Sequence, residues 1–143
     1  MAGTTHTEVF NCSVPEFFKI VSDYEKYPEF LNEVKAARVL KNDGEKKLVE
    51  YKVSVIKTFT YTLAMTERES NSISWEFVSG EVFKTSSGSW KLEDEAGKTR
   101  ATYTVEATFS MFVPGPIAKT LLTVNLPTMM SAYHKRVKEM FGK

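Results

Sequence analysis

The chain has 143 residues, a formal net charge of +1 and a single cysteine. The lone Cys12 excludes an intramolecular disulfide and a cysteine-rich metal site, and the balanced charge provides no long-range field to recruit nucleic acid. Residues 1–8 are polar and unlike a secretory signal, and no stretch reaches the roughly 18 apolar residues of a membrane span. Without repeats or linker-like runs, the chain is expected to be one cytoplasmic domain over residues 1–143 with no nucleic-acid partner.

The first predicted elements are a strand and a short helix. Residues 4–12 are rich in β-branched and aromatic side chains, which favours a strand. Ser13 and Glu16 have the spacing of a capping box, so a helix is expected over about Pro15–Ser22. Proline disfavours helical geometry in the residue before it. A separate short helical turn is therefore expected at Pro28–Leu31.

From Val34 onward the apolar pattern has a period of two, which predicts an antiparallel meander. Turn residues such as Asn42-Asp43-Gly44 and Ser86-Ser87-Gly88 punctuate it. Six strands are expected, at Lys35–Lys41, Lys47–Thr58, Thr60–Glu69, Ser72–Val78, Val82–Leu92 and Lys98–Met111. Alternation places the apolar side chains on one face, namely Val49, Tyr51, Val53, Val55, Tyr61, Leu63, Met65, Ile73, Trp75, Phe77, Trp90, Leu92, Ala101, Tyr103, Val105, Ala107 and Phe109. The opposite positions are mostly polar, so one face of the sheet must be covered.

The predicted cover is the C-terminal segment from about Pro116 to Met140, where apolar residues recur at steps of three and four. This would be the longest helix in the chain. Pro127 lies within it and removes a backbone hydrogen bond. A kink or a break near Asn125 is therefore expected, and a kinked helix would open more easily as a lid.

Two local motifs carry a resemblance to a known family. The segment 23–31, Asp-Tyr-Glu-Lys-Tyr-Pro-Glu-Phe-Leu, is similar to a D-x-x-x-Y-P-x-F motif. Residues 113–117, Val-Pro-Gly-Pro-Ile, followed by Asn125-Leu126-Pro127 resemble the entry into a proline-interrupted last helix. Both motifs resemble the START-like (SRPBCC) superfamily, in its polyketide cyclase/dehydrase and lipid transport family, near the coenzyme Q-binding branch. After Leu31 the chain continues Asn32-Glu33-Val34, where that branch often has Pro-Trp-Cys.

The resemblance implies an α+β helix-grip (START/Bet v 1-like) fold: a seven-stranded curved antiparallel sheet around a long C-terminal helix, with one or two short helices after the first strand. It also implies a ligand between the inner sheet face and the last helix. The implied lining residues are Val53, Val55, Tyr61, Leu63, Met65, Trp75, Phe77, Trp90, Tyr103, Val105, Leu121, Leu122, Asn125, Met129 and Tyr133. Taken singly, an apolar residue of this set is read more simply as core packing.

Polar candidates for other kinds of site are few. His6 and His134 are far apart, with no partner at metal-ligand spacing, so no metal site, catalytic triad or cofactor is predicted. His134 is expected on the surface, and Glu67 and Glu69 on a solvated strand edge. The inner face offers tyrosines and Asn125 but no His, Asp or Glu. No catalytic residue is therefore assigned.

The leading functional hypothesis is binding or transport of a hydrophobic small molecule: a lipid, an isoprenoid quinone or a polyketide-like aromatic. A polyketide cyclase/dehydrase is the first alternative, and a ribosome- or protein-interaction module of the toxin-like branch is the second. The expected partner is the ligand itself, exchanged through transient membrane contact. The protein is expected to be a monomer or a weak dimer.

Overall fold

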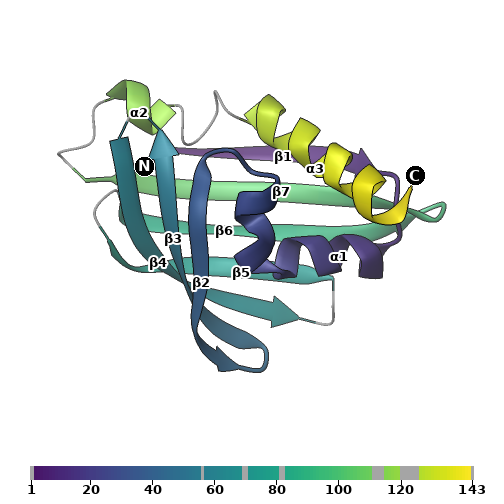
Figure 1. Ribbon diagram of the computed structural model, residues 1–143, viewed down its shortest axis with the longest axis horizontal. Coiled ribbons are helices and arrows are strands. Elements are labelled where there is room, and N and C mark those ends of the chain that lie inside the picture. The colour runs from purple at the N-terminus through teal and green to yellow at the C-terminus, as the bar shows by residue number, and fades with distance from the viewer. Residues whose placement is uncertain are drawn as a thin grey trace.

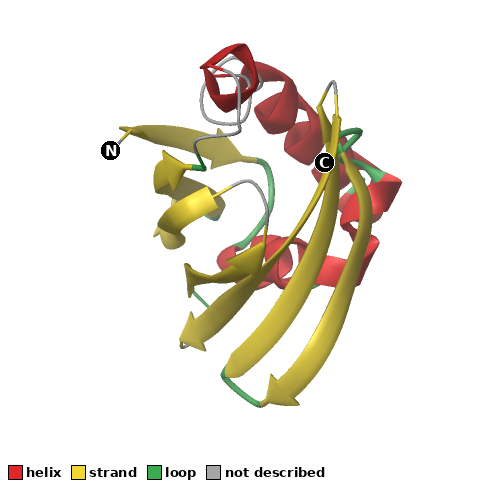
Figure 2. Ribbon diagram, turned by 90° about the vertical axis from the view of Figure 1, so that its left-hand side faces the viewer, coloured by secondary structure: helices red, strands yellow, loops and turns green. Residues whose placement is uncertain are grey.

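The computed structural model describes residues 2–55, 57–68, 71–80, 83–110, 115–119 and 126–142. Within these ranges the chain forms a seven-stranded sheet and helices that all lie on its concave side (Figures 1 and 2). The strands are β1 (Ala2–Phe10), β2 (Val34–Asp43), β3 (Lys46–Val55), β4 (Lys57–Arg68), β5 (Ser72–Gly80), β6 (Phe83–Glu95) and β7 (Lys98–Phe109). Each predicted strand is confirmed to within a few residues, and so is the helix-grip architecture.

The sheet is antiparallel throughout, in the order β1-β7-β6-β5-β4-β3-β2. Neighbours in sequence pair from β2 to β7, and β1 then adds to the free edge of β7. Pairing shifts register between Thr62 and Leu63 on β4 against β5, and between Phe83 and Thr85 on β6 against β7. The pairing skips Val78 of β5 in the first shift and Lys84 of β6 in the second, the pattern of a β-bulge, which bends the strand that carries the extra residue.

Helix α1 (Val14–Ser22) confirms the predicted capping box. Ser13 Oγ accepts a hydrogen bond from the backbone N–H of Glu16, and Glu16 Oε1 accepts one from the N–H of Ser13. Phe17 on the buried side of α1 stacks on Phe10 of β1, with ring centroids 4.3 Å apart. The opposite edge of Phe17 meets Trp90 of β6 at 5.6 Å. These contacts fill the space beneath α1.

The short turn expected at Pro28–Leu31 is placed too late in the sequence. The structure has a 3₁₀ helix, η1, at Tyr24–Glu29, with Pro28 inside it. A 3₁₀ helix has three residues per turn, so Tyr24 and Tyr27 lie on the same side, and both are buried. Burial of this pair starts the turn four residues earlier than the proline alone predicts.

The C-terminal segment is described as two helices, α2 (Gly115–Lys119) and α3 (Leu126–Phe141). The predicted long C-terminal helix is confirmed as α3. Pro127 stands in the first turn of α3, where its missing N–H leaves no gap in the hydrogen bonding. The residue singled out for the kink, Asn125, lies outside the described residues. Buried side chains of α3, Met130, Tyr133 and Val137, face the sheet. None of the helices in the described ranges is long and apolar enough to cross a membrane.

Candidate functional site

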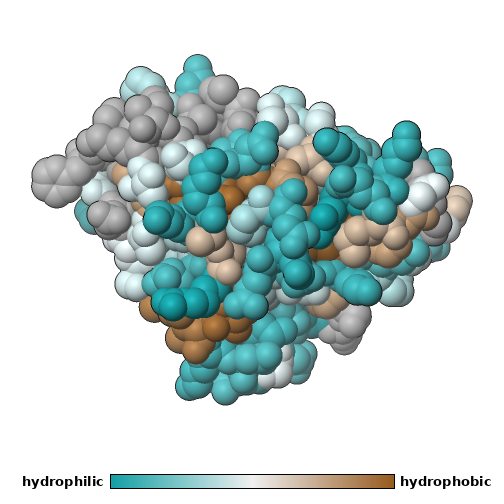
Figure 3. All heavy atoms as spheres, in the orientation of Figure 1, coloured by the Kyte–Doolittle hydropathy of each residue, from teal (hydrophilic) through white to brown (hydrophobic). Residues whose placement is uncertain are grey.

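A cavity of about 170 Å³ lies between the concave face of the sheet and helix α3. Most of the surface seen in Figure 3 is hydrophilic, and hydrophobic side chains show in the gap between β2 and α3. The cavity is lined by Tyr27, Leu31, Val34, Tyr51, Tyr61, Leu63, Met65, Ile73, Trp75, Phe83, Ser86, Trp90, Tyr103, Val105, Met129 and Tyr133. It is therefore an apolar chamber with hydroxyl groups set into its wall.

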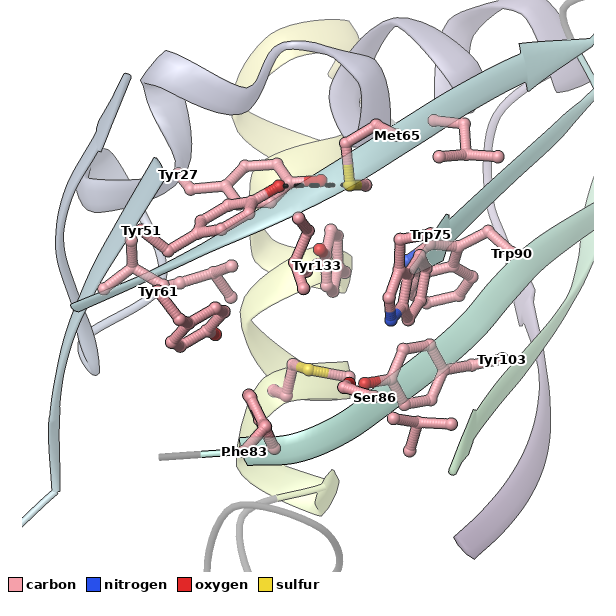
Figure 4. A pocket seen from close by; sticks show the side chains of 16 residues that line it. Tyr27, Tyr51, Tyr61, Met65, Trp75, Phe83, Ser86, Trp90, Tyr103 and Tyr133 are labelled. Carbon is pink, nitrogen blue, oxygen red and sulfur yellow. Dashed lines mark hydrogen bonds between the residues drawn. The ribbon is translucent and has the colours of Figure 1, made fainter. Parts of the chain in front are cut away.

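The hydroxyl groups come from separate elements and converge on one space (Figure 4). Tyr27 belongs to η1, Tyr51 to β3, Tyr61 to β4, Tyr103 to β7 and Tyr133 to α3. A sixth hydroxyl comes from β6, which contributes Ser86. A few polar groups in an otherwise apolar wall are typical of small-molecule sites, because they orient a ligand held mainly by burial.

Three of these tyrosines use their hydroxyl groups within the protein. Tyr27 Oη donates to the carbonyl oxygen of Val21, and Tyr51 Oη lies 3.7 Å from Met65 Sδ. The hydroxyl of Tyr133 is hydrogen-bonded to that of Tyr27. The hydroxyls of Tyr61 and Tyr103 make no hydrogen bond within the described ranges. No fully buried polar side-chain atom in these ranges lacks a partner, so both hydroxyls must reach the open space of the cavity.

The part of the cavity wall that the structure describes is uncharged. Burial raises the pKa of the Tyr103 hydroxyl to about 12. The pKa of Tyr61 rises for the same reason, with the nearby Tyr103 as a second cause. Burial also raises the pKa of Tyr133. These phenols stay protonated near neutral pH, and the lining residues that the structure describes include no Lys, Arg, His, Asp or Glu. The described lining can donate and accept hydrogen bonds but contains no charged group to pair with an ionised ligand.

Nine of the fifteen residues expected from the sequence line this cavity: Tyr61, Leu63, Met65, Trp75, Trp90, Tyr103, Val105, Met129 and Tyr133. Val53 is buried but lies outside the lining. Phe77 also lies outside it, and its ring packs against Phe83 at a centroid distance of 6.1 Å. The backbone of Val55 is in β3, and its side chain is outside the described part, as are Leu121, Leu122 and Asn125.

Seven lining residues were not expected. Tyr51 and Ile73 lie on the predicted inner face, so the strand alternation already contained the signal for them. Tyr27 and Leu31 belong to η1 and the residues just after it. Val34 begins β2, while Phe83 and Ser86 are on β6. Residues Ser86-Ser87-Gly88 were interpreted as turn punctuation, but they lie inside the continuous strand β6.

Gly88 has a packing role in this strand. It pairs with Trp75 on β5 and with Val105 on β7. A Cβ atom at this position would overlap the carbonyl oxygen of Thr104 and lie 2.5 Å from Trp75 Cζ2. Glycine within a strand often marks such a close approach. The absent side chain lets the Trp75 indole lie against β6 and form part of the cavity wall.

Helix α3 is joined to the rest of the fold by polar contacts on both sides, which the sequence did not reveal. His134 Nε2 lies 2.6 Å from Glu8 Oε2, and His6 Nε2 lies 2.8 Å from Glu8 Oε1. Arg136 donates to Glu29 of η1 at 2.9 Å and lies over the ring of Phe30. Glu8 of β1 therefore contacts both histidines, a common partner that their spacing in the sequence does not indicate. Among the described residues, no group of three His, Cys, Asp or Glu side chains is placed to hold a metal ion.

The contact between Glu8 and His134 predicts a small acid sensitivity. The hydrogen bond from His134 lowers the pKa of Glu8, against an opposing effect of burial. A lowered pKa contributes stability that is present above the unfolded value of about 4.3 and is lost as the pH falls through the folded value. Glu8→Gln should therefore remove about 0.5–1 kcal/mol of stability near neutral pH and less near pH 3.

Urea denaturation at a series of pH values measures this difference. The control variant is Glu93→Gln, which alters an exposed carboxylate on β6 and should follow the wild-type pH dependence. If Glu8→Gln and the wild type differ by the same amount at every pH, the interpretation is wrong.

Glu67 is not on a solvated edge as expected. Its carboxylate accepts a hydrogen bond from the Tyr24 hydroxyl at 2.7 Å and pairs with Lys47 at 2.8 Å. The side chains of Lys47 and Glu67 are only 18% and 14% exposed. Lys47 and Glu67 lie on the inner face of β3 and β4, beyond the cavity lining. Because Tyr24 belongs to η1, its hydrogen bond to Glu67 anchors η1 to the sheet.

Comparison with known proteins places the chain in a family. The model for polyketide cyclase/dehydrase and lipid transport proteins matches residues 11–133. The protein TTHA0849 from Thermus thermophilus has the same fold, with a TM-score of 0.86 and 15% identity over 98% of this chain and 99% of that chain. A START superfamily protein from Mycobacterium smegmatis has a TM-score of 0.84 and 22% identity, covering 96% of this chain and 98% of that one.

The Zhui aromatase/cyclase from Streptomyces sp. R1128 is also similar, with a TM-score of 0.83 and 13% identity over 94% of this chain and 92% of that chain. No curated protein sequence matches. The structural likenesses concern the fold, and the family match rests on most of the chain. The chain therefore belongs to the polyketide cyclase/dehydrase and lipid transport family.

Proposed function

We propose that this protein binds and carries a hydrophobic small molecule in the cavity between the sheet and α3. The observation that carries the proposal is the cavity itself, an apolar chamber beneath the C-terminal helix with hydroxyl groups of Tyr61 and Tyr103 facing its space. Transfer of apolar ligand surface from water contributes roughly 25 cal/mol per Å² before the costs of ordering. The hydroxyl groups then fix the orientation of the ligand.

Binding fits this wall better than cyclase or dehydrase catalysis. General acid–base chemistry at neutral pH needs a group whose pKa lies near 7. The tyrosines of the lining have a pKa far above that range, Tyr103 at about 12. The carboxylate of Glu67, on the inner face of β4 but outside the lining, is engaged by Tyr24 and Lys47. A role in folding a reactive chain without proton transfer is the form of catalysis that this lining favours.

The finer expectations stay predictions. They are membership of the coenzyme Q-binding branch, ligand exchange at a membrane surface, a monomeric or weakly dimeric state and a cytoplasmic location. The ligand roles of Val53, Phe77, Val55, Leu121, Leu122 and Asn125 also stay predictions. Substitution of each of these residues, followed by the binding assays described below, tests its role in ligand binding.

Native mass spectrometry of the purified protein, followed by organic extraction, tests the proposal. We expect a hydrophobic compound to be released in a near-stoichiometric amount, or the empty protein to bind one from a panel of lipids, quinones and aromatics. Val105→Phe puts a ring into the cavity and should abolish this binding. Thr104→Phe adds the same ring on the other face of β7 and should not. A bare mass together with no binding to the panel would contradict the proposal.

A further inference from the structure

We propose that the ligand is a compact, uncharged aromatic compound of one or two rings that carries at least one oxygen atom. This inference rests on the proposed function and sharpens it, because it separates three ligand classes that an apolar cavity alone does not distinguish. Size, charge, ring contacts and unpaired hydroxyl groups carry it independently.

The cavity is small for a member of a ligand-binding fold. Its volume is about 170 Å³, whereas pockets for drug-sized molecules range over about 300–1,000 Å³. An engineered apolar cavity of about 150 Å³ holds benzene. The space thus matches a ligand of one or two rings, and a long acyl or isoprenoid chain would require the wall to move.

The lack of charge in the described lining argues against ligands with an ionised group, such as fatty acids. None of the described lining residues is charged, and an ionised group without a partner is costly to bury. A fatty acid carboxylate would lose its hydration at this wall and find no Lys or Arg among the described lining residues in exchange. A neutral ligand carries no such cost.

The far end of the cavity is built of aromatic rings. The ring centroid of Tyr103 lies 4.9 Å from that of Trp90 and 5.9 Å from that of Trp75. Trp90 in turn meets Tyr133 of α3 edge-on at 5.3 Å. Aromatic pairs favour offset and edge-to-face contacts with centroids about 4.5–7 Å apart. A planar ring can extend this cluster in the same geometry.

Three hydroxyl groups are available to a ligand oxygen. Within the described residues, Tyr61, Tyr103 and Ser86 line the cavity without a hydrogen bond to the protein. Figure 4 shows the hydroxyl end of Tyr103 pointing toward Ser86. A hydroxyl group both donates and accepts, so this corner fits a phenol, a ketone or a quinone oxygen. A pure hydrocarbon would leave these groups unsatisfied.

Calorimetric titration of the purified protein with 2-naphthol, naphthalene and oleate tests the inference. We expect 2-naphthol to bind with one-to-one stoichiometry and about tenfold more tightly than naphthalene, as one hydrogen bond would produce. Oleate should neither bind with that stoichiometry nor compete. Tyr103→Phe should reduce the affinity for 2-naphthol toward that for naphthalene and leave naphthalene binding unchanged. Tyr24→Phe is the matched control, because Tyr24 lies outside the cavity lining and its hydroxyl donates to Glu67.

The outcomes separate this inference from the function on which it rests. One-to-one binding of oleate without binding of either ring compound would overturn the ligand class and leave the carrier function intact. Equal affinities for 2-naphthol and naphthalene would overturn the oxygen contact. Failure of all three compounds to bind, with a bare mass in native mass spectrometry, would overturn both proposals.

Discussion

Replacing Gly88 by alanine is expected to lower the free energy of unfolding by about 1–3 kcal/mol and to distort the ligand cavity. The new Cβ would overlap the Thr104 carbonyl and press on the Trp75 indole. Removing a glycine also restricts the unfolded chain, which favours folding by about 0.4–1 kcal/mol where the native geometry tolerates a side chain. The Thr104 carbonyl is part of the sheet backbone and cannot move aside as a flexible side chain can. The destabilisation from the overlap therefore exceeds the stabilisation from restricting the unfolded chain.

Urea denaturation and tryptophan fluorescence together measure this effect. The chain has two tryptophans, and both Trp75 and Trp90 line the cavity, so the emission spectrum reports displacement of the wall. Gly115→Ala is the control, since a Cβ at that position meets nothing within 4 Å. If Gly88→Ala were as stable as the control, the tight approach of β5 to β6 would be contradicted.

Alkaline pH is expected to unfold this protein cooperatively between about pH 10 and 11. All six tyrosines have a raised pKa, in every case chiefly because they are buried. A raised pKa contributes stability that is complete below the unfolded value of about 10 and is lost as the pH rises toward the folded value. Each tyrosine then lowers the free energy of unfolding by about 1.4 kcal/mol at pH 11. Six together approach about 8 kcal/mol, comparable with the stability of a typical domain of about 5–15 kcal/mol.

The measurement is tyrosinate absorbance followed together with far-ultraviolet circular dichroism. Absorbance should stay low until the sheet signal is lost, and the two curves should coincide. In concentrated urea the same protein should titrate gradually with a midpoint near pH 10. A gradual rise in absorbance with an intact sheet would mean that the tyrosines reach solvent in the folded state.

The sheet and its buried face were predictable because one physical rule dominates them. With one face covered, period-two alternation fixes which side chains point inward. Val49, Leu63, Ile73 and Ala101 are all buried as predicted. The nine expected residues that line the cavity follow from this rule together with the family resemblance. The rule also placed Tyr51 inward, and only the selection of lining residues omitted it.

The bulge in β6 explains a residue that alternation could not find. Ser86, Gly88, Trp90 and Leu92 share the inner parity of this strand, whereas Phe83 has the opposite parity and still lines the cavity. The register shift between Phe83 and Thr85 inserts one extra residue and reverses the alternation. Bulges depend on pairing across strands, so a pattern within one strand carries little information about them.

Polar contacts between distant elements escaped the sequence for a related reason. Glu8 meets His134 across 126 positions, and Tyr24 meets Glu67 across 43. Neither pair has a local spacing that marks it. Each becomes visible only when the fold brings β1 beside α3 and η1 beside β4.

The pairing of β1 with β7 constrains the order in which this chain can fold. Phe10 pairs with Thr99 and Ala2 with Ala107, so the first strand has no partner until almost the whole meander exists. Closing so long a loop is entropically costly, and folds rich in distant pairings fold slowly. During synthesis from the N-terminus, residues 2–10 would stay unpaired while β2 to β6 form their local hairpins. Docking of β1 is therefore expected as a late, slow phase of folding. Until then the edge of β7 has unpaired backbone groups, and a chaperone would need to cover this edge to prevent aggregation.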